Sequence, residues 1–126
     1  MDQEKDNLIL KLSFEFSLKV IQYVEQLEME RKYVIGNQLL KSGTSIGANV
    51  REAQHAESKR DFLHKLKIAM KEVEETEYWL DLCIHAEHYP TPQGLPDDLQ
   101  SLKRVLSKII GSLVQRYPEL QRKSSH

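Results

Sequence analysis

Apolar residues recur along this chain at steps of three and four positions, which is the spacing of one face of an α-helix. The first such segment predicts a helix over about residues 8–29. Its inner face consists of Ile9, Phe16, Val20, Val24 and Leu27. A second apolar row beside that face consists of Leu10, Phe14 and Ile21. The combined face is wide, and we therefore expect this helix to contact more than one neighbouring helix.

The next apolar row is unbroken and predicts a second helix over about residues 33–56. Its members are Ile35, Leu39, Gly43, Ile46, Val50 and Ala53. Residues 42–45 have the composition of a loop, but the row keeps its helical phase through them, which favours one continuous helix. Each glycine inside a helix costs about 1 kcal/mol relative to alanine. We therefore expect Gly43 and Gly47 to serve helix packing, as a small-xxx-small pair that lets another backbone approach closely.

A third helix is predicted over about residues 59–88. Ser58 is a suitable cap for it, and Asp61 lies in the first turn, where a carboxylate is favourable. Its core row consists of Phe62, Leu66, Ala69, Val73, Thr76, Leu80 and Ile84. Over residues 78–84 apolar side chains surround the whole helix, which indicates burial on all sides. A subunit interface explains this better than three neighbouring helices do, and its expected residues are Tyr78, Trp79 and Leu82.

The fourth helix is predicted over about residues 97–117, after a loop rich in proline. Asp97 is its expected cap, and Pro118 should end it before a polar tail at 119–126. Its core row consists of Leu99, Leu102, Leu106, Ile109, Leu113 and Tyr117. Short connections between the first three helices favour antiparallel neighbours. The predicted fold class is all-α, a single domain over 1–126 built as an antiparallel up-down four-helix bundle.

The formal net charge of −1 hides an uneven distribution of charge. Residues 31–71 carry nine basic and three acidic side chains, whereas residues 72–99 carry eight acids and no lysine or arginine. Such blocks give a surface faces of opposite sign, although neighbouring helices could also neutralise each other. The acidic first residues, the absence of a long apolar run and the single cysteine, Cys83, predict a cytoplasmic protein that does not enter a membrane.

The motifs that could carry chemistry fail one after another. Residues 43–47 match the GxSxG pattern of a serine nucleophile, but that motif requires a strand before a sharp turn, and here a helical row continues. Glu52 and His55 have the spacing of a metal-binding pair in a bundle, yet they lie opposite the core row. Cys83 is expected to be an inert buried thiol. We therefore predict no enzymatic activity, no metal and no cofactor.

A basic ridge on the third helix remains as a candidate site. It consists of Arg60, His64, Lys67 and Lys71, spaced at i, i+4, i+7 and i+11 opposite the core row. Arg51 and Lys41 of the second helix could widen it. Lysine and arginine on a rigid helix suit phosphate contacts, which provide affinity without reading a base sequence. An acidic protein surface, including the acidic segment of a neighbouring copy, would suit the ridge equally well.

Residues 38–80 carry a family resemblance. The segments QLL-SGTSIGAN-REA and SK-DF--KL-IA-KE--ET-YWL resemble the bacterial rRNA intervening-sequence proteins, and the flanking helices agree in length and order. The resemblance implies a four-helix bundle, a ring-like homopentamer and no known enzymatic activity. Some members are encoded inside intervening sequences of 23S rRNA genes, and a related branch, the accessory proteins of diversity-generating retroelements, associates with reverse transcriptase and nucleic acid.

The resemblance implies no agreed functional residues. Its most specific positions, Ser42 to Ser45, Gly47, Asn49 and Arg51, are expected to serve helix packing and assembly. A pI near 6.5 is low for a dedicated nucleic-acid binder. The sequence predicts a non-catalytic homo-oligomer that contacts RNA or DNA through Arg51, Arg60, His64, Lys67 and Lys71. The alternative is a protein-interaction scaffold that binds an acidic partner and no nucleic acid.

Overall fold

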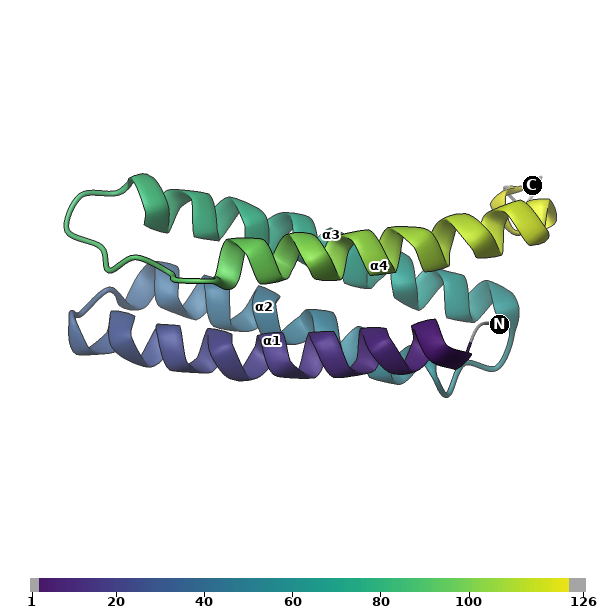
Figure 1. Cartoon of the computed structure of the whole chain (residues 1–126), viewed down its shortest axis with the longest axis horizontal. Coiled ribbons are helices and arrows are strands. Elements are labelled where there is room, and N and C mark those ends of the chain that lie inside the picture. The colour runs from purple at the N-terminus through teal and green to yellow at the C-terminus, as the bar shows by residue number, and fades with distance from the viewer. Residues whose placement is uncertain (1–2, 123–126) are drawn as a thin grey trace.

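The computed structural model describes residues 3–122 and confirms the all-α bundle. The elements are α1 (Gln3–Met29), α2 (Tyr33–Ala53), α3 (Lys59–His85), α4 (Leu95–Arg116) and the short 3₁₀ helix η1 (Pro118–Gln121). The four long helices run alternately up and down the long axis (Figure 1). Each packs against two others in the order α1–α2–α3–α4, and α4 closes on α1.

Three of the eight predicted helix ends coincide with the observed ones, and the other five differ by one to five residues. Helix α1 begins at Gln3 instead of residue 8, because its first turn is polar and leaves no apolar periodicity to follow. Helix α2 ends at Ala53 instead of residue 56, and the next three residues form a turn. Helix α3 ends at His85 instead of residue 88, since the backbone of Ala86 is extended. The first residues of the predicted polar tail form part of η1. Residues 123–126 of that tail lie outside the described residues.

The caps of α3 and α4 explain where these helices begin. Ser58 caps α3 as predicted, with its side chain accepting a 3.0 Å hydrogen bond from the amide of Asp61. The prediction of Asp97 as the cap of α4 was wrong. Gly94 takes that position with a left-handed backbone (φ 78°), a conformation that favours glycine, and α4 begins at Leu95. Asp97 instead lies in the first turn of α4.

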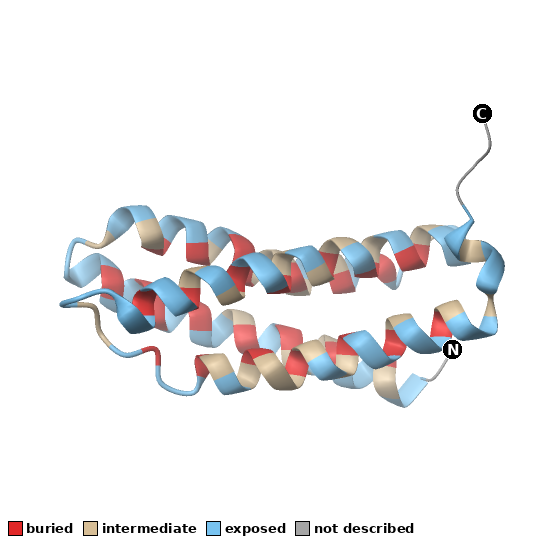
Figure 2. Cartoon of the chain, turned by 90° about the horizontal axis from the view of Figure 1, so that it is seen from above, coloured by how far each residue is buried: buried red, intermediate tan, exposed pale blue. Residues whose placement is uncertain are grey.

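The inner face of every helix contributes to one continuous apolar core (Figure 2). Phe16, Leu39, Leu66 and Leu102 are among its fully buried side chains, one from each helix. A polar pair crosses the core, where the Thr76 hydroxyl donates a 2.9 Å hydrogen bond to the Ser42 hydroxyl. Thr76 was assigned to the core row, but Ser42 was not. Both hydroxyls also lie within hydrogen-bond distance of a carbonyl of their own helix, Glu72 for Thr76 (2.7 Å) and Leu39 for Ser42 (3.5 Å), so the buried pair is satisfied.

Two glycines of α2 face α1 at close range. A β-carbon at Gly43 would lie 3.0 Å from both γ-carbons of Val20. A β-carbon at Gly47 would lie 3.3 Å from the backbone oxygen of Ser13. A larger side chain at either position would therefore push α1 and α2 apart. These contacts give the two glycines a packing role at the α1/α2 contact.

Candidate interaction surfaces

The basic ridge lies on the outer face of α3, opposite the core. Arg60, His64, Lys67 and Lys71 are all exposed. Within residues 3–122, Lys67 and Lys71 make no ion pair and no side-chain hydrogen bond. Their ammonium groups are therefore hydrated charges in the single chain, available to a partner that offers phosphate or carboxylate oxygens.

Arg60 differs from the rest of the ridge because its guanidinium is already used. It donates hydrogen bonds to the carbonyl oxygens of Glu119 (3.1 Å) and Leu120 (3.3 Å) and so holds η1 against α3. Next to it, the ammonium of Lys59 lies 4.6 Å from the centre of the Tyr117 ring. The carbonyl acceptors are neutral, so Arg60 keeps its full charge at the end of the ridge.

The structure does not bring Arg51 to the ridge. Its guanidinium lies 5.9 Å from the centre of the Phe14 ring of α1, on the side of α2 that faces away from α3. Lys41 lies nearer to α3, where its charge acts on Glu72. Burial, followed by the charge of Glu75, raises the pKa of Glu72, and Lys41 opposes that rise. The ridge of α3 is therefore narrower than predicted, with Arg51 on a separate face.

A shallow groove of about 410 Å³ between α3 and α4 borders the ridge. Lys67 and Lys71 form its basic side, and Met70 of α3 with Ile110 of α4 forms its apolar part. Gly111 widens it, since a β-carbon there would meet nothing within 4 Å. A partner on the ridge could therefore make apolar contacts in addition to charge contacts. The sequence missed this groove because Lys67 and Ile110 are far apart along the chain.

The predicted subunit-interface residues are partly exposed on the single chain. Tyr78 is 58% and Leu82 36% exposed, on the same face of α3 as the ridge. Trp79 is half-buried, and its ring meets that of Tyr78 edge-on at 5.2 Å. Beyond the ridge, the outer face of α3 therefore carries the exposed apolar side chains of Tyr78 and Leu82 among the exposed acidic residues Glu74, Glu75 and Asp81.

A second exposed apolar row lies on α1. Phe14, Leu18 and Ile21 are 53%, 47% and 39% exposed, at i, i+4 and i+7. The sequence showed Phe14 and Ile21 as apolar but assigned them to contacts with neighbouring helices. Helix α1 contacts α2 and α4 through its buried inner face, and the ring centre of Phe14 in the outer row also lies 5.9 Å from the Arg51 guanidinium of α2. Of the predicted second row, Leu10 packs against the core, whereas Phe14 and Ile21 are largely exposed.

The candidate chemical motifs have structural places. Ser45, the central residue of the GxSxG pattern, lies in the middle of α2 and donates a 2.6 Å hydrogen bond to the Lys41 carbonyl. Cys83 is buried, and that burial raises the pKa of its thiol. In the described part of the chain, no three His, Cys, Asp or Glu side chains converge as metal ligands. Nor does any helix there have the length and apolar character to cross a membrane.

Comparisons with known proteins agree with this architecture. The model of the family described as 23S rRNA-intervening sequence protein matches residues 5–112. A crystal structure of a protein of unknown function from the S23 ribosomal protein family of Bacteroides thetaiotaomicron VPI-5482 is 42% identical and superposes with a TM-score of 0.80. The alignment covers 85% of this chain and 98% of that one. A comparison with curated proteins found no similar sequence.

Proposed function

The chain belongs to the 23S rRNA-intervening sequence protein family, and from this membership and its basic ridge we propose that it is an oligomeric RNA-binding accessory protein. The family description links its members to ribosomal RNA, a polyanion rich in structure. The observation that carries the proposal is the pair Lys67 and Lys71, exposed and free of ion pairs in the described chain. Such a ridge binds the phosphate backbone through charge and leaves the base sequence unread.

Self-association would bring several copies of the ridge together in one assembly. The apolar surfaces at Tyr78 and Leu82 of α3 and at Phe14 and Leu18 of α1 differ from each other and lie on different helices. Exposed apolar surfaces of this kind mark protein contacts. A contact between two different surfaces of identical subunits is heterologous, and it closes a ring when the rotation allows. An oligomer would present several ridges to one RNA, which raises the overall affinity of individually weak contacts.

The test is a charge reversal on the ridge. Lys67→Glu/Lys71→Glu should weaken the binding of a structured RNA by at least about tenfold, because two attractive contacts become repulsive and about 1.4 kcal/mol suffices for a factor of ten. The matched control is Arg104→Glu/Lys108→Glu, which makes the same charge change at exposed positions with the same i, i+4 spacing on α4. Equal losses in both variants would show that net charge alone acts, and no loss in either would remove the ridge from RNA binding.

The second candidate is a protein-interaction scaffold, favoured by the apolar groove between α3 and α4. An acidic helix could place carboxylates on Lys67 and Lys71 and apolar side chains on Met70 and Ile110. The dependence of binding affinity on salt concentration distinguishes the RNA-binding function from the protein scaffold. RNA binding through phosphates weakens steeply as salt rises, whereas a contact dominated by apolar burial does not.

A further inference from the structure

The groove between α3 and α4 is open because the residues of α4 beside it are small. Lys103, Ser107 and Gly111 follow one another at i, i+4 and i+8 on the side of α4 next to α3. Lys103 reaches across and pairs with Glu77 of α3 at 3.4 Å. Ser107 is short and Gly111 has no side chain, so α4 leaves the two lysines on the opposite wall uncovered. The groove of about 410 Å³ therefore lies directly beside this ion pair.

Gly111 has no packing role within the described chain. A β-carbon at this exposed position would meet nothing within 4 Å. By contrast, Gly36, Gly43 and Gly47 lie against α1, and Gly94 has a positive φ. A glycine inside a helix lowers stability relative to alanine, and glycine is the residue that lets a ligand approach the backbone closely. Gly111 thus points to an occupant of the groove.

The apolar floor of the groove is small. It consists of Met70 and Ile110, both already partly buried against the core. A helix is about 10–12 Å wide with its side chains, and these two residues would cover little of its apolar face. A flat ring of the size of a nucleobase can lie on both residues and against the backbone at Gly111. The thioether of Met70 adds a favourable contact with an aromatic ring. The floor therefore favours a planar aromatic group over a protein helix.

The polar groups around this floor match the rest of a nucleotide. Lys67 and Lys71 are separated by about 6 Å along the axis of α3, and they can contact successive phosphates of one strand. Glu74 and Ser107 are exposed and form no hydrogen bond or ion pair with any residue that the structure describes. The Glu74 carboxylate repels a phosphate but accepts a hydrogen bond from the amino group of a base. Phosphates are thus directed to the lysines, and the edge of a base to Glu74.

We propose that the groove between α3 and α4 receives one unpaired base of an RNA whose phosphates lie on Lys67 and Lys71. In a duplex the bases are paired and stacked, and extrusion of a base costs free energy. Bulges, loops and single strands offer bases that are already free. This preference rests on the proposed function, RNA binding by the ridge, and narrows it to RNA with unpaired bases.

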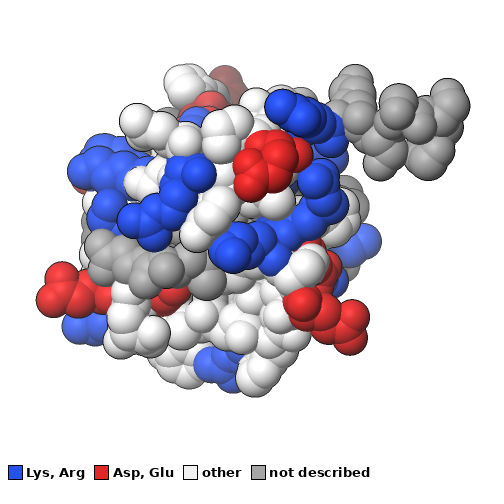
Figure 3. Space-filling model, turned by 90° about the vertical axis from the view of Figure 1, so that its right-hand side faces the viewer, with Lys and Arg blue, Asp and Glu red and all other residues white. Residues whose placement is uncertain are grey.

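The strand has a basic path in one direction only. On one side of the groove, the Glu77–Lys103 ion pair joins the two helices. On the other side, the ridge continues to the exposed Arg60 at the start of α3. Figure 3 views this end of the bundle and shows Lys and Arg side chains gathered on it. The phosphates that follow the bound base should therefore run toward this end.

The experiment titrates the full chain with two matched RNA duplexes. One carries a single bulged 2-aminopurine, a fluorescent analogue of adenine, and the other lacks the bulge. The bulged duplex should bind at least about tenfold more tightly, because it alone fills the groove at nearly the same charge. This factor corresponds to about 1.4 kcal/mol, which burial of about 60 Å² of apolar surface provides. The fluorescence of the bulged base should rise on binding, because stacking quenches 2-aminopurine and the base leaves its stack.

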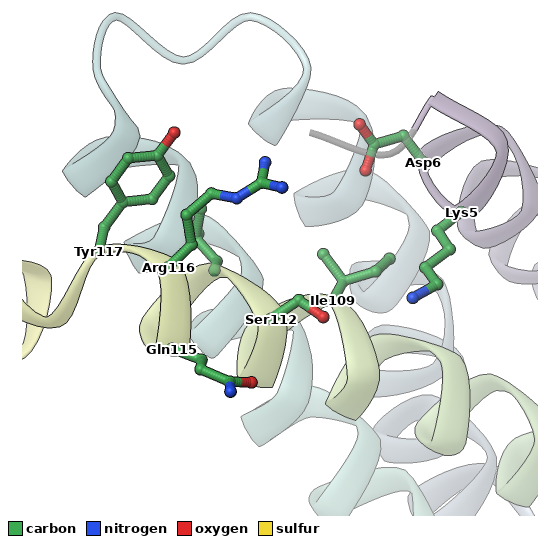
Figure 4. A pocket seen from close by; sticks show the side chains of 8 residues that line it. Lys5, Asp6, Ile109, Ser112, Gln115, Arg116 and Tyr117 are labelled. Atoms are coloured by element: carbon green, nitrogen blue, oxygen red, sulfur yellow. The ribbon is translucent and has the colours of Figure 1, made fainter.

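Gly111→Leu fills the groove without changing a charge. It should remove the advantage of the bulged duplex and the rise in fluorescence, while the affinity for the perfect duplex stays constant. Ser112→Leu is the matched control, because it adds the same side chain at the next position. Figure 4 shows Ser112 at a separate hollow between α1 and α4. This variant should bind both duplexes as the native protein does, and circular dichroism checks that both variants keep their helix content.

The possible failures are distinguishable. Equal affinity for the two duplexes, or a preference for the bulge that survives Gly111→Leu, would overturn the base site. Neither result would affect RNA binding by the ridge, which Lys67→Glu/Lys71→Glu tests separately. Absence of binding to either duplex would overturn both proposals. If an acidic amphipathic peptide then bound and Gly111→Leu blocked it, the groove would belong to a protein partner instead.

Discussion

The contact between α1 and α2 leaves no room for a side chain at Gly43. The variant Gly43→Ala therefore measures how much this close packing contributes to the free energy of unfolding. The new β-carbon would lie 3.0 Å from both γ-carbons of Val20. Val20 is fully buried, and a β-branched residue in a helix has one strongly preferred rotamer. Rotation of its side chain therefore cannot relieve both contacts, and the two helices must separate.

Two opposing effects set the magnitude. Replacement of glycine by alanine inside a helix gains about 1 kcal/mol. Overpacking of a well-packed core costs about 1–3 kcal/mol. Gly43→Ala should therefore lower the free energy of unfolding by about 0–2 kcal/mol. Gly111→Ala is the matched control, because a β-carbon at Gly111 meets nothing within 4 Å. It should stabilise the protein by about 1 kcal/mol.

Urea denaturation followed by far-UV circular dichroism, at one fixed protomer concentration, measures both variants. The difference between them should be about 1–3 kcal/mol, since the gain in helix propensity is common to both. A cycle that adds Val20→Ala isolates the contact, because removal of the γ-carbons should make Gly43→Ala more favourable. Equal stabilisation by Gly43→Ala and Gly111→Ala would refute the packing role of Gly43.

Two further predictions concern Glu72 and the apolar surface of α3. Because burial and Glu75 raise the pKa of Glu72, its carboxylate form is disfavoured in the folded state, and the associated stability is lost as pH rises through the folded pKa. Glu72→Gln should thus raise the melting temperature at pH 7, with the gain vanishing below about pH 4. A lower melting temperature at pH 7 would show that the attraction between Glu72 and the Lys41 charge outweighs burial. Leu82→Glu, at a partly exposed position, should reduce the mass found by light scattering while the helix content stays constant, and an unchanged mass would exclude this surface from the subunit contact.

Helix positions could be predicted from this sequence because periodicity depends on one helix at a time. The unbroken apolar row through residues 42–45 identified α2 as continuous despite its glycines. Boundaries were harder, because they depend on local backbone geometry. Gly94 caps α4 in a left-handed conformation, which cannot be predicted from a pattern of apolar residues. Asp97 was predicted instead because aspartate is a common cap residue. The first turn of α1 is polar, so it could not be predicted from apolar periodicity either.

Some parts of the candidate sites could likewise be predicted from the sequence, and others could not. The ridge could be predicted because its residues share one face of α3, which sequence spacing alone determines. The surroundings of Arg51 could not be predicted, because they depend on which neighbouring helix lies against its side of α2. The groove beside the ridge combines Lys67 of α3 with Ile110 of α4, two residues far apart along the chain that only the packing of α3 against α4 brings together. Sites made by one helix can be predicted, and sites made by contacts between distant segments cannot.

The salt dependence of RNA affinity tests the central claim most directly. Native protein and Lys67→Glu/Lys71→Glu would be titrated with one single-stranded RNA over a series of salt concentrations. The logarithm of affinity should fall linearly with the logarithm of salt, and the variant should lose about 1.4 from the slope, at about 0.7 for each phosphate contact. Equal slopes for the two proteins, or an affinity that does not respond to salt, would contradict phosphate binding by the ridge of α3.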